Sequence, residues 1–132
     1  MLTATLRNVI RLASVFTIAL FLAACSGHFS AGDLLGKYVL SVDDGVDTIE
    51  LDANETYVHS YKPKGGAVDY QNGTWALEEL QAGPTVVLNG FRSLRGEPVR
   101  GQVIYLLLVR KSLLGAPRLI TNIDLNEGYV KQ

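Results

Sequence analysis

Residues 37–61 read KYVLSVDDGVDTIELDANETYVHSY, three short segments of alternating apolar and polar residues separated by two turns. A period of two is typical of a strand with one buried face. The turns are Asp43-Asp44-Gly45 and Asp52-Ala53-Asn54-Glu55, and residues of these types favour tight reversals of the chain. The stretch therefore predicts three antiparallel strands, over residues 37–42, 46–51 and 56–61.

The same alternation continues through the rest of the chain and predicts strands over residues 72–80, 86–91, 118–125 and 129–131. Residues 103–109, VIYLLLV, are apolar without interruption. Such a run indicates a strand that is covered on both faces, by the core on one side and by a further cover on the other. Seven or eight short strands with little helix predict an all-β domain over residues 34–132, either a small antiparallel β-barrel or a meander.

The first 24 residues differ from this pattern. They carry Arg7 and Arg11, no acidic residue, and an apolar run over residues 12–24. A basic segment followed by an apolar one is the layout of a secretory signal peptide. The apolar run is shorter than the roughly 20 residues that a helix needs to cross a bilayer. We therefore expect a leader that is removed rather than a permanent membrane span.

The leader ends in Leu22-Ala23-Ala24-Cys25, which resembles the lipobox of bacterial lipoproteins. The resemblance implies that residues 1–24 are cleaved and that Cys25 is lipid-modified as the first residue of the mature chain. Several acyl chains would then anchor the protein to a bilayer surface, with residues 25–33 as lipidated cysteine and flexible tether. Ser26, next to the cysteine, resembles the pattern sorted to the outer membrane of a bacterium with two membranes, which would place the domain in the periplasm.

Three segments of the domain carry a second resemblance. They are Gly36-Lys-Tyr-Val-Leu40, Leu51-Asp-Ala-Asn-Glu-Thr-Tyr-Val58 and Gly73-Thr-Trp-Ala-Leu77. Together they resemble the small lipocalin-like domains of many bacterial lipoproteins. The resemblance implies a barrel and constrains the function little.

Composition excludes several function classes. With 12 Lys and Arg against 13 Asp and Glu in 132 residues, and no basic run, the chain has no electrostatic footprint for nucleic acid. A single cysteine forms neither an internal disulfide nor a thiolate zinc cluster. His28 lies in the tether, His59 stands alone on a strand, and no serine occupies a Gly-x-Ser-x-Gly motif. We expect a binding protein with no catalytic residue, no metal site and no cofactor.

Two exposed features are candidates for contact with a protein partner in the envelope. Asp43, Asp44 and Asp47 belong to an acidic hairpin, which either is simply solvated or steers a basic partner. Leu113 and Leu114 lie in a hairpin tip after the apolar strand. With the outer face of residues 103–109, they predict an interaction module, such as an accessory subunit or an inhibitor or immunity lipoprotein.

The alternative is a lipocalin-like carrier or sensor of a small apolar or amphipathic ligand. Tyr38, Trp75 and Tyr105 are the residues that would line its cavity. The same aromatic side chains are most simply explained by core or cross-strand packing. Arg92, Arg95 and Arg100 fall in a loop before the apolar strand, where they are either solvated or contact an anion.

Overall fold

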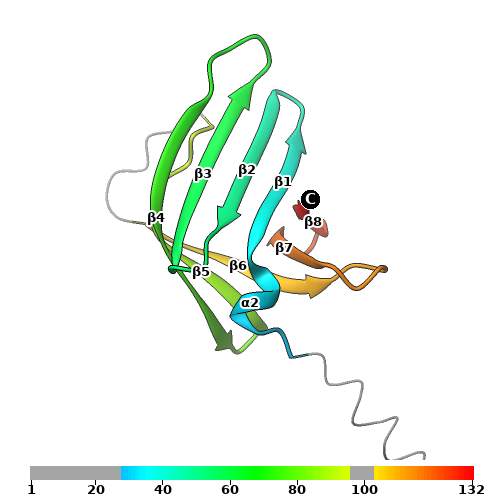
Figure 1. Ribbon diagram of the computed structural model, residues 1–132. Helices are drawn as coiled ribbons and strands as arrows, with labels where there is room; N and C mark the ends of the chain where they lie inside the picture. The colour runs from blue at the N-terminus through cyan, green and yellow to red at the C-terminus, as the bar shows by residue number, and fades with distance from the viewer. Residues whose placement is uncertain (1–27, 96–102) are drawn as a thin grey trace, which may run out of the picture.

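The computed structural model describes residues 28–95 and 103–132. Cys25, the lipobox and Arg100 lie outside the described residues. A short helix, α2 (Ala31–Leu34), precedes eight strands that form a closed barrel in sequence order (Figure 1). The strands are β1 (Gly36–Val42), β2 (Gly45–Leu51), β3 (Thr56–Pro63), β4 (Asp69–Leu80), β5 (Gly83–Phe91), β6 (Val103–Lys111), β7 (Pro117–Asn122) and β8 (Glu127–Lys131). The prediction of a small antiparallel β-barrel is confirmed.

Adjacent strands pair antiparallel, and the last pairing closes the barrel. β1 and β2 pair along their whole length, from Gly36↔Leu51 to Val42↔Gly45. The closing seam between β1 and β8 is shorter, with pairs at Tyr38↔Lys131 and Val39↔Val130. One more bond extends it, because the backbone N–H of Gln132 donates to the carbonyl of Lys37 over 2.9 Å.

The strands differ from the predicted ranges mainly at their ends. β7 stops at Asn122, whereas the sequence predicted a strand to residue 125. The side-chain oxygen of Asn122 accepts bonds from the backbone N–H groups of Asp124 and Leu125, and Asn126 has a positive φ of 50°. Asparagine stabilises turns in this way, so the chain turns over residues 123–126 and enters β8 at Glu127.

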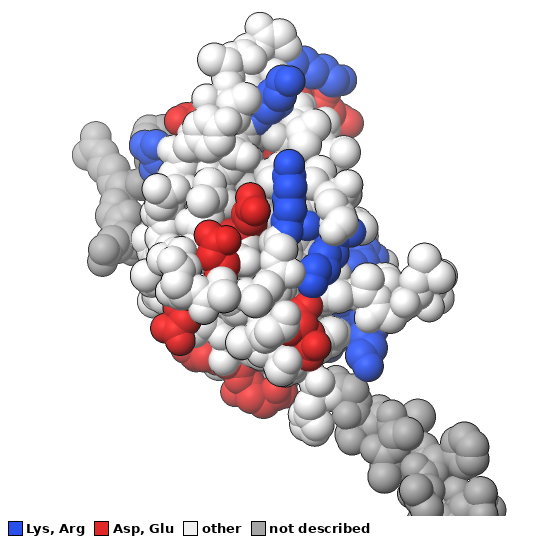
Figure 2. Space-filling view, in the orientation of Figure 1, with Lys and Arg blue, Asp and Glu red and all other residues white. Residues whose placement is uncertain are grey.

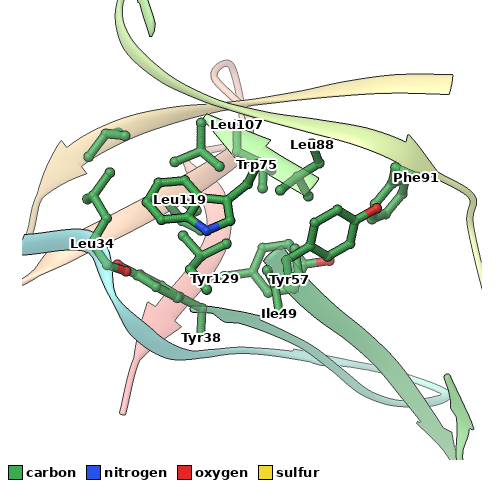
Figure 3. Close-up of a cluster of buried hydrophobic side chains, with 13 residues drawn as sticks. Leu34, Tyr38, Ile49, Tyr57, Trp75, Leu88, Phe91, Leu107, Leu119 and Tyr129 are labelled. Atoms are coloured by element: carbon green, nitrogen blue, oxygen red, sulfur yellow. The ribbon is translucent and has the colours of Figure 1, made fainter. Parts of the chain in front are cut away.

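Inward-facing side chains from all eight strands fill the barrel (Figure 3). Two large aromatic residues of the core bond to backbone carbonyls at helix α2 and the β2–β3 turn. The Tyr38 hydroxyl donates to the carbonyl of Leu34 over 2.8 Å, and the Trp75 Nε1–H donates to the carbonyl of Asp52 over 3.0 Å. These bonds offset the cost of burying a phenol and an indole.

A close approach between neighbouring strands fixes one glycine of β4. A Cβ at Gly73 would collide with the carbonyl oxygen of Asn89 and with the ring of Tyr57. The Tyr57 hydroxyl contacts the same carbonyl, over 3.4 Å. Glycine at this position therefore lets the Tyr57 ring lie across β4.

Helix α2 lies at one end of the barrel, which we call the helix end. It begins with a capping box in which Ser30 and Asp33 bond to each other's backbone N–H groups. Leu34 is fully buried, and the Lys131 ammonium donates to the carbonyl of Asp33 over 2.8 Å. The β2–β3, β4–β5 and β6–β7 turns share this end, whereas the β1–β2, β3–β4 and β7–β8 turns lie at the opposite end.

Candidate functional site

A groove lies on the outer face of β6 and β7. Its floor is formed by Leu108 and Ile120, which are paired in register. Their chain neighbours Leu107, Val109 and Leu119 face the core, so Leu108 and Ile120 point outward by the alternation of a strand. They are nevertheless only 6% and 4% exposed. Apolar side chains that are sheltered on the outside of a barrel mark a concave surface.

Residues from the two flanking turns form the walls of this groove. Leu113 comes from the β6–β7 turn, and Ile123 and Asn126 come from the β7–β8 turn. With Arg110, Lys111, Ser112 and Arg118, they enclose about 490 Å³. We call this surface the β6–β7 groove.

Arginine gives the groove its polar character. Arg110 and Arg118 pair across β6 and β7, and both line the groove. The Arg118 Nη2 donates to the carbonyl of Asn126 over 3.3 Å. Its Nε is buried and has no hydrogen-bond partner among the described residues. A buried N–H without an acceptor is costly. Arg110, by contrast, is exposed, so its guanidinium is open to an anionic group at the groove.

The β6–β7 turn projects from the barrel as an apolar tip. Leu113 and Leu114 are both fully exposed, as the sequence predicted for the hairpin. The turn is closed by bonds from the Ser112 N–H to the Ala116 carbonyl, 2.8 Å, and from the Gly115 N–H to the Ser112 carbonyl, 2.9 Å. Gly115 has a φ of 83°, which glycine adopts without strain.

The outer face of β6 is covered along only part of its length. Leu108 is buried, but Ile104 and Leu106 are exposed. The prediction that residues 103–109 are covered on both faces is therefore wrong for the first half of the strand. The reason lies in the pairing, because β7 joins β6 at Leu108↔Ile120 and ends at Asn122.

Inside the barrel, Asp47, His59 and Gln71 form a polar line across β2, β3 and β4. The Nε2 of His59 lies 2.6 Å from Oδ1 of Asp47, and the Nδ1 lies 3.0 Å from Nε2 of Gln71. The Gln71 Oε1 accepts a bond from the Arg92 N–H over 3.0 Å. The Gln71 amide nitrogen must then donate to Nδ1, which assigns the proton of a neutral His59 to Nε2.

This polar line overturns one expectation. Asp47 was expected in a solvated acidic hairpin, but it is 5% exposed and faces His59, which is fully buried. The His59 ring also stacks on Phe91, with centroids 4.6 Å apart, and Phe91 stacks on Tyr105 at 4.4 Å. Both nitrogens and one face of the imidazole thus have partners within the protein.

The other predicted interaction residues lie on separate surfaces. Asp43 and Asp44 are exposed in the β1–β2 turn at the opposite end of the barrel, where Asp44 lies 3.8 Å from Arg95. Leu113 and Leu114 lie at the helix end. The structure does not bring the acidic turn and the leucine tip together.

The predicted cavity residues are also dispersed. Tyr38 and Trp75 belong to the packed core, and Tyr105 is half-buried against Phe91. Trp75 also lines a second groove of about 530 Å³ beside α2, together with Leu35, Leu77 and Glu55. Of the three aromatic residues, Trp75 is the one that reaches this groove.

Comparisons with protein-family models, curated proteins and solved structures find no match for this chain. Within residues 28–95 and 103–132, no helix is long and apolar enough to cross a membrane. The same residues contain no group of three or more His, Cys, Asp or Glu side chains placed to hold a metal ion.

Proposed function

We propose that the protein is a lipid-anchored binding lipoprotein of the bacterial envelope, without catalytic activity or cofactor, that holds a protein partner in the β6–β7 groove. An accessory subunit and an inhibitor or immunity protein are the two kinds of protein that would act in this way. The anchor is the expected lipid on Cys25, and the site of attachment is the periplasmic face of the outer membrane.

The groove carries this proposal because it combines two features of a recognition site. Its floor, Leu108 and Ile120, is apolar and already sheltered from water, so an apolar side chain of a partner would fill it at little cost in reorganisation. Its rim carries Arg110, Lys111 and Arg118, which would pair with a carboxylate. The partner segment is therefore an apolar residue flanked by Asp or Glu.

Variants of the two tip leucines distinguish partner binding in the groove from partner binding by the rest of the tip. Leu113 lines the groove, and Leu114 does not belong to its lining residues. The full chain is solubilised from envelope membranes in detergent and used as bait for partner capture, followed by mass spectrometry. We expect wild type and Leu114→Asp to capture the same protein. Leu113→Asp should fail to capture it, and Arg118→Gln should capture less of it.

Two results would count against the proposal. One is capture of the same protein by all four baits, which would place the interaction elsewhere. The other is no specific protein with wild type, which would favour a small-molecule ligand. Circular dichroism of the two leucine variants should match wild type, since both leucines are fully exposed.

The groove beside α2 supports the carrier alternative. It is lined by Trp75, the only tryptophan of the chain, and by the apolar side chains of Leu35 and Leu77. A small apolar ligand bound there would change the fluorescence of Trp75. Titration with an apolar probe should then give a saturable change that Leu77→Glu abolishes, and a linear or absent response would remove this alternative.

A further inference from the structure

The leucine tip and the start of the described chain lie close together. Phe29 packs against the core at the helix end, and the Lys111 ammonium lies 5.7 Å from the centroid of the Phe29 ring. Lys111 is the last residue of β6, directly before the turn that carries Leu113 and Leu114. The tether therefore joins the barrel at the base of the tip.

The expected anchor is near this point. Cys25 precedes Phe29 by four residues, and a chain extends at most about 3.5 Å per residue. The lipidated cysteine would then lie within about 14 Å of Phe29. This step rests on the proposed lipid anchor. It places the helix end of the barrel, with the tip, toward the bilayer.

Charge on the helix end is divided between two sides. Basic side chains surround the tip on β6, β7, β8 and β1, namely Arg110, Lys111, Arg118, Lys131 and Lys37. Acidic side chains occupy the β2–β3 turn and the end of β4, namely Asp52, Glu55, Glu78 and Glu79. Two further exposed acidic residues lie among the basic ones: Asp33 in α2, near Lys131 and Lys111, and Glu50, the register partner of Lys37. Figure 2 shows the basic group beside the projecting white tip and acidic residues along the lower edge. An anionic surface would attract the tip side and repel the β2–β4 side.

We propose that Leu113 and Leu114 insert into the anionic phospholipid bilayer that holds the anchor, as a second membrane contact. Two fully exposed leucines on a narrow turn, flanked by cations, present apolar groups to the acyl region and positive charge to lipid phosphates. A second point of attachment restricts the orientations that the barrel can take at the bilayer. The β6–β7 groove then opens next to the lipid surface, because Leu113 lines the groove and is also part of the inserted tip.

A fluorophore at the tip tests the proposal in the full lipidated chain. The natural chain has one cysteine, which the lipid would occupy, so an introduced cysteine is the single reactive thiol. Leu114→Cys is labelled with an environment-sensitive dye and reconstituted in phosphatidylcholine vesicles with or without phosphatidylglycerol. Lys64→Cys, exposed in the β3–β4 turn at the opposite end, is the matched control.

We expect the dye at position 114 to shift to the blue and to lose most of its emission to nitroxide-labelled lipid, whereas the dye at position 64 does neither. Anionic lipid should strengthen the effect, and Arg110→Gln with Lys111→Gln should reduce it. Equal, water-like emission at both positions would overturn the tip proposal while leaving the anchor intact. A wild-type chain that reacts with the dye at Cys25 and does not float with vesicles would overturn the anchor and the tip proposal together.

Discussion

The imidazole of His59 and the carboxyl group of Asp47 meet at 2.6 Å in the interior of the barrel, two positions away from direct cross-strand register, since His59 pairs with Ile49. Gln71 fixes the other ring nitrogen. The three polar side chains thus bond to one another where apolar side chains would otherwise fill the barrel, and removal of one leaves another without a partner.

Replacing Asp47 should therefore reveal the cost of an unpaired buried imidazole. Asp47→Ala is expected to lower the free energy of unfolding by about 2 to 3 kcal/mol, because the His59 Nε2–H loses its acceptor. Asp47→Asn keeps an oxygen at the same place and should lose less than half as much. Urea unfolding at neutral pH, followed by circular dichroism, measures both. Equal losses in the two variants would contradict this account, because Asp47→Asn keeps both the acceptor oxygen and the volume of the side chain.

Buried tyrosines predict a loss of stability in alkali. Burial raises the pKa of Tyr57 to about 12 and also raises the pKa of Tyr38 and Tyr129. The unfolded phenols have a pKa of about 10. Between these values the folded state holds more protons than the unfolded state. The contribution of the buried tyrosines to the free energy of unfolding is therefore fully present below about pH 10 and decreases as the pH rises above it.

Absorbance of phenolate at 295 nm, recorded together with circular dichroism, tests this expectation. The phenolate signal of the buried tyrosines should appear with the loss of strand structure. Tyr70→Phe removes an exposed phenol and so identifies the part of the signal that does not come from the buried tyrosines. Full ionisation of all six tyrosines near pH 10 in a folded barrel would contradict the prediction.

The packing at Gly73 predicts a strong effect of a single methyl group. Gly73→Ala drives a Cβ into the Asn89 carbonyl and the Tyr57 ring, and overpacking of this kind costs about 1 to 3 kcal/mol. Gly32→Ala is the matched control, because its Cβ would lie 3.8 Å from Ser30 Oγ, an ordinary contact. Thermal unfolding should show a lower midpoint for Gly73→Ala and little change for Gly32→Ala. A wild-type midpoint for Gly73→Ala would mean that β4 shifts freely past Tyr57.

The proposed anchor predicts the fate of a Cys25→Ala chain. Without the thiol, no lipid can be attached, so the protein should remain unprocessed or leave the membrane fraction on cell fractionation. Mass spectrometry of wild type should find the acyl groups on an N-terminal Cys25. A processed Cys25→Ala chain that stays with the membrane as strongly as wild type would contradict the lipid anchor.

The alternation of residue types predicts most of the fold, because each strand of an antiparallel barrel buries every second side chain. Asp47 shows how far this signal extends. It shares its face with Ile49 and Leu51, as His59 does with Tyr57 and Tyr61, so the parity of the strands already indicated that both face inward. The acidic character of the hairpin favoured a surface position instead.

The β6–β7 groove could not be predicted in the same way. It depends on the register Leu108↔Ile120 and on the early end of β7 at Asn122, and neither follows from alternation alone. The apolar run over residues 103–109 indicated that part of the outer face of β6 is covered. It did not indicate which residues of that face remain in contact with water.

The short closing seam has a mechanical consequence. An anchor before α2 would hold the chain through β1, whereas a partner in the β6–β7 groove would load the strands that lead to β8. A force between membrane and partner would then act along two routes. One runs through the strand pairings from β1 to β6, and the other through the β1–β8 seam at Tyr38↔Lys131 and Val39↔Val130. The bonds of Lys131 to Asp33 and of Gln132 to Lys37 reinforce that seam. Lys131 and Gln132 would thus raise the tension at which the seam opens.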